Sequence, residues 1–206
     1  MGVQERRERE REARKDAVLD AAREILLEKG FRGTTTKAIA ARCELSEATL
    51  FFYFNNKDEI LASLLFESIG FWGEGLDKIA RSSIDSEKKL NQIWRFHEKV
   101  NDEHPEYYLI SAYLAQPNSL DGVSKEIKGR IVQQSGDNFQ RLANLLEETT
   151  GHDDGRHMAD TMWATFLGLM LLRESRVNLG HGDVRNTKLD RKTAFDWLKY
   201  GFLENK

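Results

Sequence analysis

The chain has 206 residues, 40% of them apolar and 32% charged, with a formal net charge of −3. This composition excludes disordered, collagen-like and fibrous chains and is sufficient for a buried core without metals or disulfides. A single cysteine excludes an internal disulfide, and the charged segment 5–16 leaves no apolar stretch for a signal peptide, so we expect a cytoplasmic protein. The longest uncharged apolar run, residues 162–172, is too short to span a bilayer, so no membrane partner is expected.

The first predicted helix is amphipathic. Val18, Ala22, Ile25 and Leu26 share one face, and Gly30 can adopt the left-handed conformation that ends a helix. Before this face, Arg and Glu alternate through residues 4–15. That segment is either a solvated helical extension or an arm that binds phosphates, and the pattern leaves both interpretations open.

Two short helices are expected next. The threonines of residues 34–36 offer an N-cap to a helix that carries Ile39 and Ala40, and residues 44–45 interrupt it. Ser46 then caps a helix over 47–54. Asn56 and Glu59 have the spacing of a capping box, which predicts another helix starting at residue 57.

Helical periodicity continues to the end of the chain, with no internal repeat and no strand pattern, so the predicted fold is all-α. The expected helices are 58–80, 86–103, 105–116, 123–149, 156–178 and 188–203. Within the first of these, Gly70, Gly73 and Gly75 indicate either that the helix ends or kinks near Gly70, with glycine easing close packing, or that the segment is compliant. Between 149 and 156, His152 and its acidic neighbours fit a loop better than a metal site.

The first three helices have the arrangement of a helix-turn-helix unit, whose second short helix can enter a DNA major groove. Its residues closely resemble the N-terminal signature of the tetracycline-repressor-type (TetR) family of bacterial regulators over about residues 15–62. The matching positions are Gly30, Phe31, Thr35, Ile39, Ala40, Leu45, Ser46, Thr49, Leu50, Phe51, Tyr53, Phe54 and Lys57.

The resemblance implies a helix-turn-helix DNA-binding domain at 1–62, with its charged extension at 1–15, and a larger helical effector-binding and dimerisation domain at 63–206. It implies a ligand-responsive repressor that binds a palindromic operator as a homodimer and is released by a small apolar or aromatic molecule. A transcriptional activator or a ligand-independent regulator is the alternative. An enzyme or a protein-interaction module is more remote, because the sequence has no nucleophile motif, ligand-spaced metal cluster or phosphate loop, and no cofactor is expected.

The candidate DNA contacts lie in and beside the two short helices. The first turn of the second short helix is expected to reach base edges, while the flanking threonines and lysines hold phosphates. For Thr35 and Ser46 capping alone is the alternative, and Lys57 can instead be a solvated lysine. Glu47 either accepts from a cytosine amine or reads no base. The predicted contact residues are Thr35, Thr36, Lys37, Ser46, Glu47, Ala48, Thr49, Phe52 and Lys57.

Phe51, Glu44 and Glu47 depart from the family pattern. Phe51 stands where a tyrosine hydroxyl commonly contacts a phosphate, and Tyr53 is expected in the core rather than as its replacement. Glu44 occupies a turn position that is often glycine, which predicts a looser turn or a strained backbone. Cys43 is either a small core residue or a redox sensor.

The second part of the chain holds all four tryptophans and many other aromatic residues, which either form plain core or line an effector pocket. The resemblance implies such a pocket among the helices 58–80, 105–116, 123–149 and 156–178. Its candidate residues are Trp72, Phe96, Tyr108, Tyr113, Phe139, Trp163 and Phe166.

The last two helices are the expected dimer surface. Residues 158–177 are apolar around most of the helix, and Phe195, Leu198 and Phe202 give the final helix a matching face. The alternative is that both faces are buried within one subunit.

Overall fold

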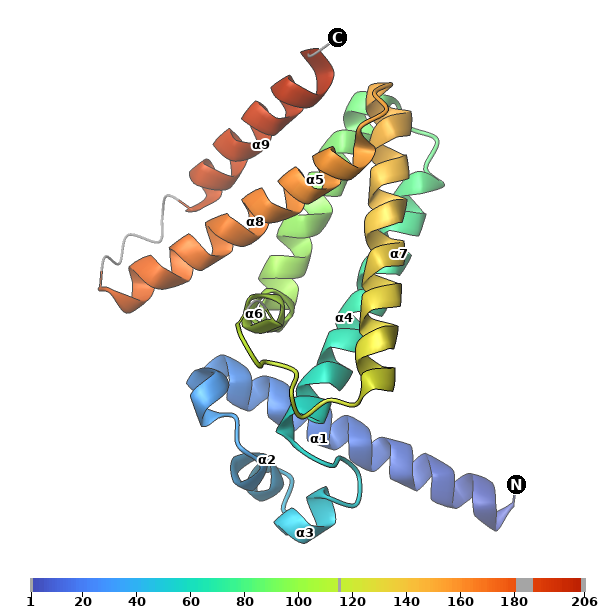
Figure 1. Ribbon diagram of the computed structural model, residues 1–206, viewed down its shortest axis with the longest axis vertical. Helices are drawn as coiled ribbons and strands as arrows, with labels where there is room; N and C mark the ends of the chain where they lie inside the picture. The colour runs from blue at the N-terminus through green and yellow to red at the C-terminus, as the bar shows by residue number, and fades with distance from the viewer. Residues whose placement is uncertain (1, 115, 181–186, 205–206) are drawn as a thin grey trace. The chain divides into compact units, whose positions relative to one another are not determined.

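The computed structural model describes residues 2–114, 116–180 and 187–204, which form nine helices and no strand, so the predicted all-α fold is confirmed (Figure 1). None of the described helices is long and apolar enough to cross a membrane. The helices are α1 (Val3–Gly33), α2 (Thr36–Arg42), α3 (Glu47–Leu50), α4 (Lys57–Ala80), α5 (Ser86–Glu103), α6 (Pro105–Leu114), α7 (Lys125–Thr150), α8 (Gly155–Asn178) and α9 (Thr187–Glu204).

The chain divides into two compact units. The first unit contains Met1–Ser68 and Pro105–Ile131, and the second contains Ile69–His104 and Val132–Lys206. Both α4 and α7 contribute residues to each unit. The sequence-based domains 1–62 and 63–206 remain a prediction, because compactness alone does not define which segments fold together.

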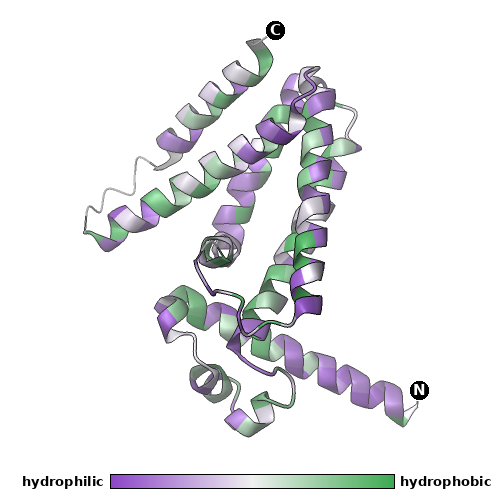
Figure 2. Cartoon of the chain, viewed as in Figure 1, coloured by the Kyte–Doolittle hydropathy of each residue, from purple (hydrophilic) through white to green (hydrophobic). Residues whose placement is uncertain are grey.

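The first unit is built on α1. Val18, Ala22 and Ile25 are buried as predicted, and Leu50 of α3 is buried with them. Figure 2 shows the hydrophilic first half of α1, where Arg6 pairs with Glu10 at 2.9 Å. This exposed half is helical, which agrees with the solvated extension, although phosphate binding is not tested by it.

A buried carboxylate helps to hold α6 in the first unit. Glu106 of α6 is 1% exposed, and its Oε1 lies 3.1 Å from Nε of Arg23 on α1. Arg23 also pairs with Glu67 of α4. A buried carboxylate needs such a partner, because transfer of an isolated charge from water is very costly.

The helical conformation of α1 is interrupted at Gly30, where the sequence predicts the end of the first helix. Its φ of 63° is positive, but its ψ of −173° is extended, so the predicted left-handed helical conformation is wrong in detail. Glycine alone adopts this combination readily, because it has no Cβ. One further turn follows before the N-cap of α2.

The helix predicted at 47–54 is shorter than expected, since α3 ends at Leu50. Beyond it, the amide of Tyr53 donates to the carbonyl of Leu50 at 2.9 Å, a tightened turn rather than a continued α-helix. The turn places Phe54 in the core at 6% exposed. Burial of this ring therefore prevails over the local helical pattern.

The second unit has an aromatic and aliphatic core. On α5, Leu90, Ile93, Trp94 and His97 are buried at helical spacing, and they share this core with the buried residues of α7 and α8. The buried residues of α8 are Met158, Ala159, Met162, Phe166 and Met170, together with Gly155.

The glycines of α4 have a packing explanation. The helix continues through all three to Ala80 and does not end near Gly70. A Cβ added at Gly75 would overlap the ring of Phe96, and one added at Gly73 would lie 2.7 Å from Nη1 of Arg141. Close approach of neighbouring side chains therefore accounts for two of them, as the packing interpretation requires.

Candidate nucleic-acid interface

The first turn of α3 is exposed to solvent. Ser46, Glu47, Ala48 and Thr49 are all exposed, whereas Leu50 is completely buried and anchors the helix. Figure 1 shows α3 beside α2 in the first unit. One turn of side chains is therefore held rigidly from below and left open to a DNA groove.

The two expected caps are present. The Thr35 hydroxyl oxygen accepts from the amide of Ala38 at 3.1 Å, and the Ser46 hydroxyl oxygen accepts from the amide of Thr49 at 3.0 Å. The hydroxyls of Ser46 and Thr49 also lie 2.8 Å apart. Both caps are exposed, so capping leaves their hydroxyls accessible to a phosphate.

Glu44 has a φ of 57° in the turn between α2 and α3, which confirms the strained backbone expected there. A non-glycine residue in this region costs about 1 kcal/mol or more, since its Cβ approaches the backbone. The turn is nevertheless kept, because Leu45 donates its amide to the Ala40 carbonyl at 2.8 Å.

Glu47 has a partner that sequence spacing does not indicate. The hydroxyl of Thr36 donates to Oε2 of Glu47 at 2.9 Å and ties the first turn of α2 to the first turn of α3. The carboxylate is thereby oriented at the exposed end of α3, where the positive end of the helix dipole favours it. Two predicted contact residues therefore act together.

The cations around this surface differ in availability. Lys37 is exposed, whereas Lys57 is half-buried and its Nζ donates to the Phe31 carbonyl at 3.4 Å. This long hydrogen bond holds the ammonium group near the end of α1. Lys57 is therefore positioned by the protein rather than fully solvated.

Arg42 is neutralised within the protein. Its guanidinium pairs with Glu24 at 2.7 Å and Glu28 at 2.8 Å, both on α1. The hydrogen bond to Glu28 raises the pKa of Arg42 and lowers the pKa of Glu28. Arg42 therefore adds little to the positive charge available for DNA.

The aromatic residues after α3 are unusually exposed. Phe52, a predicted contact, is 72% exposed, and Phe51 is 47% exposed. Tyr53 is half-buried rather than fully in the core, and its ring meets that of Phe52 edge-on at 5.5 Å. Phe51 lacks the hydroxyl of the tyrosine that is common at its position, and the helical pattern alone does not indicate that its ring is exposed.

Cys43 is a half-buried residue of the same unit. Its Sγ lies 3.5 Å from the Ala17 carbonyl oxygen, and burial raises the pKa of the thiol. A raised thiol pKa disfavours the reactive thiolate. These features support the core interpretation of Cys43 over the redox one.

Five of the seven predicted pocket residues meet in the second unit. Trp72 contacts Phe96 and Trp163, with ring centroids 4.8 and 5.7 Å away, and Trp163 contacts Phe139 at 5.9 Å. Phe166 joins them through Trp94 at 5.1 Å. We call these rings, with Trp94 and His97, the aromatic cluster.

Tyr108 and Tyr113 lie in the first unit and do not belong to the aromatic cluster. Tyr108 is buried, and Tyr113 stacks on Phe31 with ring centroids 4.3 Å apart. The stacking partner of Phe31 therefore comes from α6. The role of the two tyrosines in a pocket remains a prediction.

The centre of the aromatic cluster is a residue that the sequence did not single out. His97 of α5 is completely buried, with its ring 4.3 Å from Trp72 and 5.2 Å from Phe166. Burial lowers the pKa of His97 to about 3, so the imidazole is neutral at physiological pH. In the sequence, the helical spacing of Leu90, Trp94 and His97 indicates that α5 contributes a face to this cluster.

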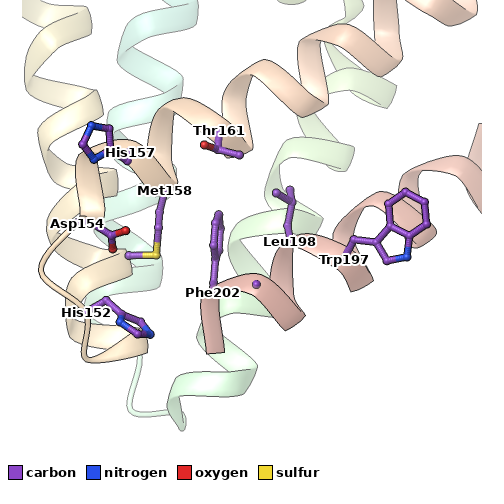
Figure 3. A pocket seen from close by; sticks show the side chains of 9 residues that line it. His152, Asp154, His157, Met158, Thr161, Trp197, Leu198 and Phe202 are labelled. Carbon is purple, nitrogen blue, oxygen red and sulfur yellow. The ribbon is translucent and has the colours of Figure 1, made fainter. Parts of the chain in front are cut away.

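A separate pocket of about 380 Å³ lies between α9 and the start of α8 (Figure 3). His152, Asp154 and Met158 line it from the α8 side, and Leu198 and Phe202 line it from α9. Among the described residues, no group of three histidine, cysteine or acidic side chains could hold a metal ion. The loop interpretation of this segment agrees with the structure.

Comparison with known sequences identifies the helix-turn-helix. Residues 18–64 match the bacterial regulatory proteins of the tetR family. The chain is 50% identical over 48 residues to the HTH-type transcriptional regulator YvkB of Bacillus subtilis, covering 23% of this chain and 25% of that protein. It is 29% identical over 80 residues to the fatty acid metabolism regulator protein of Bacillus subtilis, covering 39% and 41%. These two alignments span less than half of either relative.

A longer alignment, at 25% identity over 158 residues, covers 77% of this chain and 78% of IcaR, a negative transcriptional regulator of the biofilm operon icaADBC in Staphylococcus epidermidis. Among solved structures, the fatty acid degradation regulator FadR of Bacillus halodurans matches with a TM-score of 0.70 at 22% identity, covering 91% of this chain and 95% of that one. FadR of Bacillus subtilis in complex with stearoyl-CoA matches with a TM-score of 0.65 at 18% identity, covering 92% and 98%.

The match covers residues 18–64, which include the exposed first turn of α3 and the N-caps of α2 and α3. The fold of FadR from Bacillus halodurans is shared along 91% of this chain. Residues 18–64 therefore form a helix-turn-helix domain that matches the tetR family of bacterial regulatory proteins.

Proposed function

We propose that the protein is a ligand-responsive transcriptional repressor of the cytoplasm that binds a palindromic operator as a homodimer and is released by a small apolar or aromatic molecule. The observation that carries this proposal is the exposed first turn of α3 above the buried Leu50. Exposed side chains on the first turn of a helix are what a helix-turn-helix presents to base edges.

Sequence readout is assigned to α3 and affinity to the groups around it. Ser46, Glu47, Ala48 and Thr49 face the bases, and Thr35, Lys37 and Lys57 hold the phosphates on either side. Thr36 orients Glu47 through their 2.9 Å hydrogen bond. Phe52, exposed beyond α3, is assigned an apolar contact with a thymine methyl or a deoxyribose.

A homodimer is supported by exposed apolar side chains on the last two helices. Leu171 and Leu172 of α8 and Trp197 and Tyr200 of α9 are between 45% and 76% exposed. Phe195, which we expected on this surface, instead stacks on Trp94 at 5.1 Å inside the subunit. The proposed interface of α9 is therefore the face that carries Trp197 and Tyr200.

The effector is assigned to the aromatic cluster, whose rings offer a predominantly apolar environment. Among relatives, FadR of Bacillus subtilis is described in complex with stearoyl-CoA, and IcaR is described as a negative regulator. These descriptions favour repression and an effector with an apolar body. No feature of the chain specifically favours the alternatives of an activator or a ligand-independent regulator.

A salt-dependent gel shift on the DNA upstream of the protein's own gene tests the proposal. We expect a specific complex on an inverted repeat whose half-sites lie about 34 to 36 Å apart, one helical turn, or a multiple of that spacing. Added effector candidates, beginning with acyl thioesters and aromatic acids, should release it. Binding without preference for an inverted repeat would contradict the dimeric repressor.

A further inference from the structure

We propose that a groove between α4 and α5 in the second unit binds a small amphipathic anion, a molecule with an apolar body and one anionic head. The groove has a volume of about 320 Å³, at the lower end of the range for ligand sites. The proposal rests on the proposed function and deepens it, since Phe96 of the groove also belongs to the aromatic cluster to which the effector is assigned.

The floor of the groove is apolar and flat. Phe71 and Phe96 stack with centroids 5.6 Å apart and an interplanar angle of 23°, and Ile79 extends this surface along α4. Gly75 makes the arrangement possible, because any Cβ there would overlap the Phe96 ring. The glycine therefore lets an aromatic ring lie against the backbone of α4, where an alkyl chain or a ring can rest on it.

The rim of the groove is positively charged. Lys78 of α4 and Arg95 and Lys99 of α5 line it, against a single carboxylate from Glu74. Lys99 lies 3.7 Å from Glu103, whereas Lys78 and Arg95 make no ion pair within the described part of the chain. Two cations with no carboxylate partner beside an apolar floor are complementary to an anionic head on an apolar body.

The sequence places apolar and basic residues on the same face of each helix. On α4, residues 71, 75, 78 and 79 follow helical spacing, as do residues 92, 95, 96 and 99 on α5. A face that served only the core would be apolar, and one that served only solubility would be polar. Mixed faces that meet in one groove of about 320 Å³ favour a small amphipathic ligand.

The test is an NMR titration of the uniformly ¹⁵N-labelled full-length protein with octanoate at low ionic strength. We expect amide shifts concentrated in residues 71–79 and 92–99. Octan-1-ol has the same chain without the charge, and inorganic phosphate supplies an anion without the chain. Both should bind at least several-fold more weakly than octanoate.

Variants that remove one charge test whether octanoate binding depends on the positive charge of the rim. Lys78→Gln and Arg95→Gln should each weaken octanoate binding about two- to fivefold, and Glu74→Gln should strengthen it by a similar factor, as expected for solvent-exposed charges. Lys192→Gln is the matched control, because Lys192 is an exposed lysine of α9 outside the groove. It should leave the octanoate affinity unchanged.

Equal binding of octan-1-ol and octanoate would overturn the proposal, and so would charge variants that leave the affinity unchanged or shifts confined to other helices. Phosphate binding as tight as octanoate binding would also overturn it, since the floor would then contribute nothing. No DNA is present in this experiment, so its failure is distinct from a failure of the proposed repressor function.

Discussion

Individual side chains in the helix-turn-helix have two roles at once. Ser46 caps α3 and remains exposed, and Glu47 accepts from Thr36 while it stands at the exposed end of the helix. Such double use keeps the surface rigid before DNA arrives, which reduces the conformational entropy lost on binding. Single substitutions at these residues are informative, because their effects on protein stability and on DNA recognition can be measured separately.

Glu47→Gln is predicted to change the preferred base more than the affinity for non-specific DNA. A carboxylate accepts from the N4 amine of cytosine, whereas an amide can also donate, and glutamine pairs well with adenine. The Thr36 hydroxyl can still donate to the amide oxygen, so the link between α2 and α3 is retained. Binding-site selection from a random library measures the change. An unaltered preference would remove Glu47 from base readout.

Lys57→Ala is predicted to weaken binding to all DNA sequences similarly. One phosphate contact releases about one counterion, so the slope of log K against log salt should become shallower by about one. Fluorescence anisotropy over a salt series measures this slope. A loss of affinity restricted to one DNA sequence would contradict the phosphate role of Lys57. The variant Lys15→Ala, in the charged N-terminal extension of α1, tests whether that extension also contributes to DNA affinity.

His97 is predicted to make the protein acid-sensitive. Its pKa in the folded state is about 3, below the ordinary value of 6.5, so below pH 6.5 the unfolded chain binds a proton that the folded chain does not. The contribution to stability is therefore present above pH 6.5 and is lost as pH falls towards 3, by about 1.4 kcal/mol per pH unit at most. Urea unfolding of wild type and His97→Gln between pH 4.5 and 7.5 should show a shallower loss in the variant.

At the scale of elements, α3 and α4 each combine a structural role with a proposed binding role. α3 is a single turn anchored by Leu50, and its short length follows from the need to bury Phe54 just beyond it. α4 begins at Lys57 beside the DNA-binding surface and carries the α4–α5 groove on its second half. Its glycines therefore have to be judged one by one, according to what each of them faces.

Gly75→Ala and Gly70→Ala are predicted to change stability in opposite directions. Alanine favours a helix over glycine by about 1 kcal/mol. Gly70 has nothing within 4 Å of an added Cβ, so Gly70→Ala should be stabilising by about that amount. Gly75→Ala displaces Phe96, and overpacking of this kind costs about 1 to 3 kcal/mol, which after the gain in helix propensity leaves a net destabilisation of up to about 2 kcal/mol. Chemical denaturation distinguishes them, and equal effects would mean that Phe96 moves without cost.

Whether α4 contains a compliant segment can be tested by replacing one of its glycines with alanine. Because a Cβ at position 75 would overlap Phe96, a stiffening substitution there also changes packing, and any effect on ligand release would be ambiguous. Gly70 offers the cleaner substitution. If the segment is compliant, Gly70→Ala should bind the operator with unchanged affinity, and the ligand should release this variant from DNA less effectively than it releases the wild type.

At the scale of the whole molecule, assembly decides function, since one subunit supplies only one α3. Trp197→Glu, on the exposed face of α9, is predicted to produce monomers in analytical ultracentrifugation and to weaken operator binding at least tenfold. Its control is Val132→Glu, a similarly exposed apolar position on α7 at 72% exposure, which should remain dimeric. A dimeric Trp197→Glu protein would place the interface elsewhere.

Phe166 is not a suitable position for that experiment, although its helix belongs to the expected interface. It is completely buried against Trp94 and His97, so a charge there destabilises the subunit itself. Monomers obtained from such a variant would report unfolding rather than a lost interface.

The sequence alone determined the all-α class, most helix boundaries and the caps at Thr35 and Ser46, because periodicity and capping depend on residues within a few positions of one another. It also indicated the tetR-type helix-turn-helix domain at residues 18–64, since that signature is local. Tertiary structure decided which residues meet across long separations: the link between Thr36 and Glu47, the pairing of Arg42 with α1, and His97 at the centre of the aromatic cluster. These contacts depend on packing between elements, where shape and burial select among many partners that the sequence leaves equally possible.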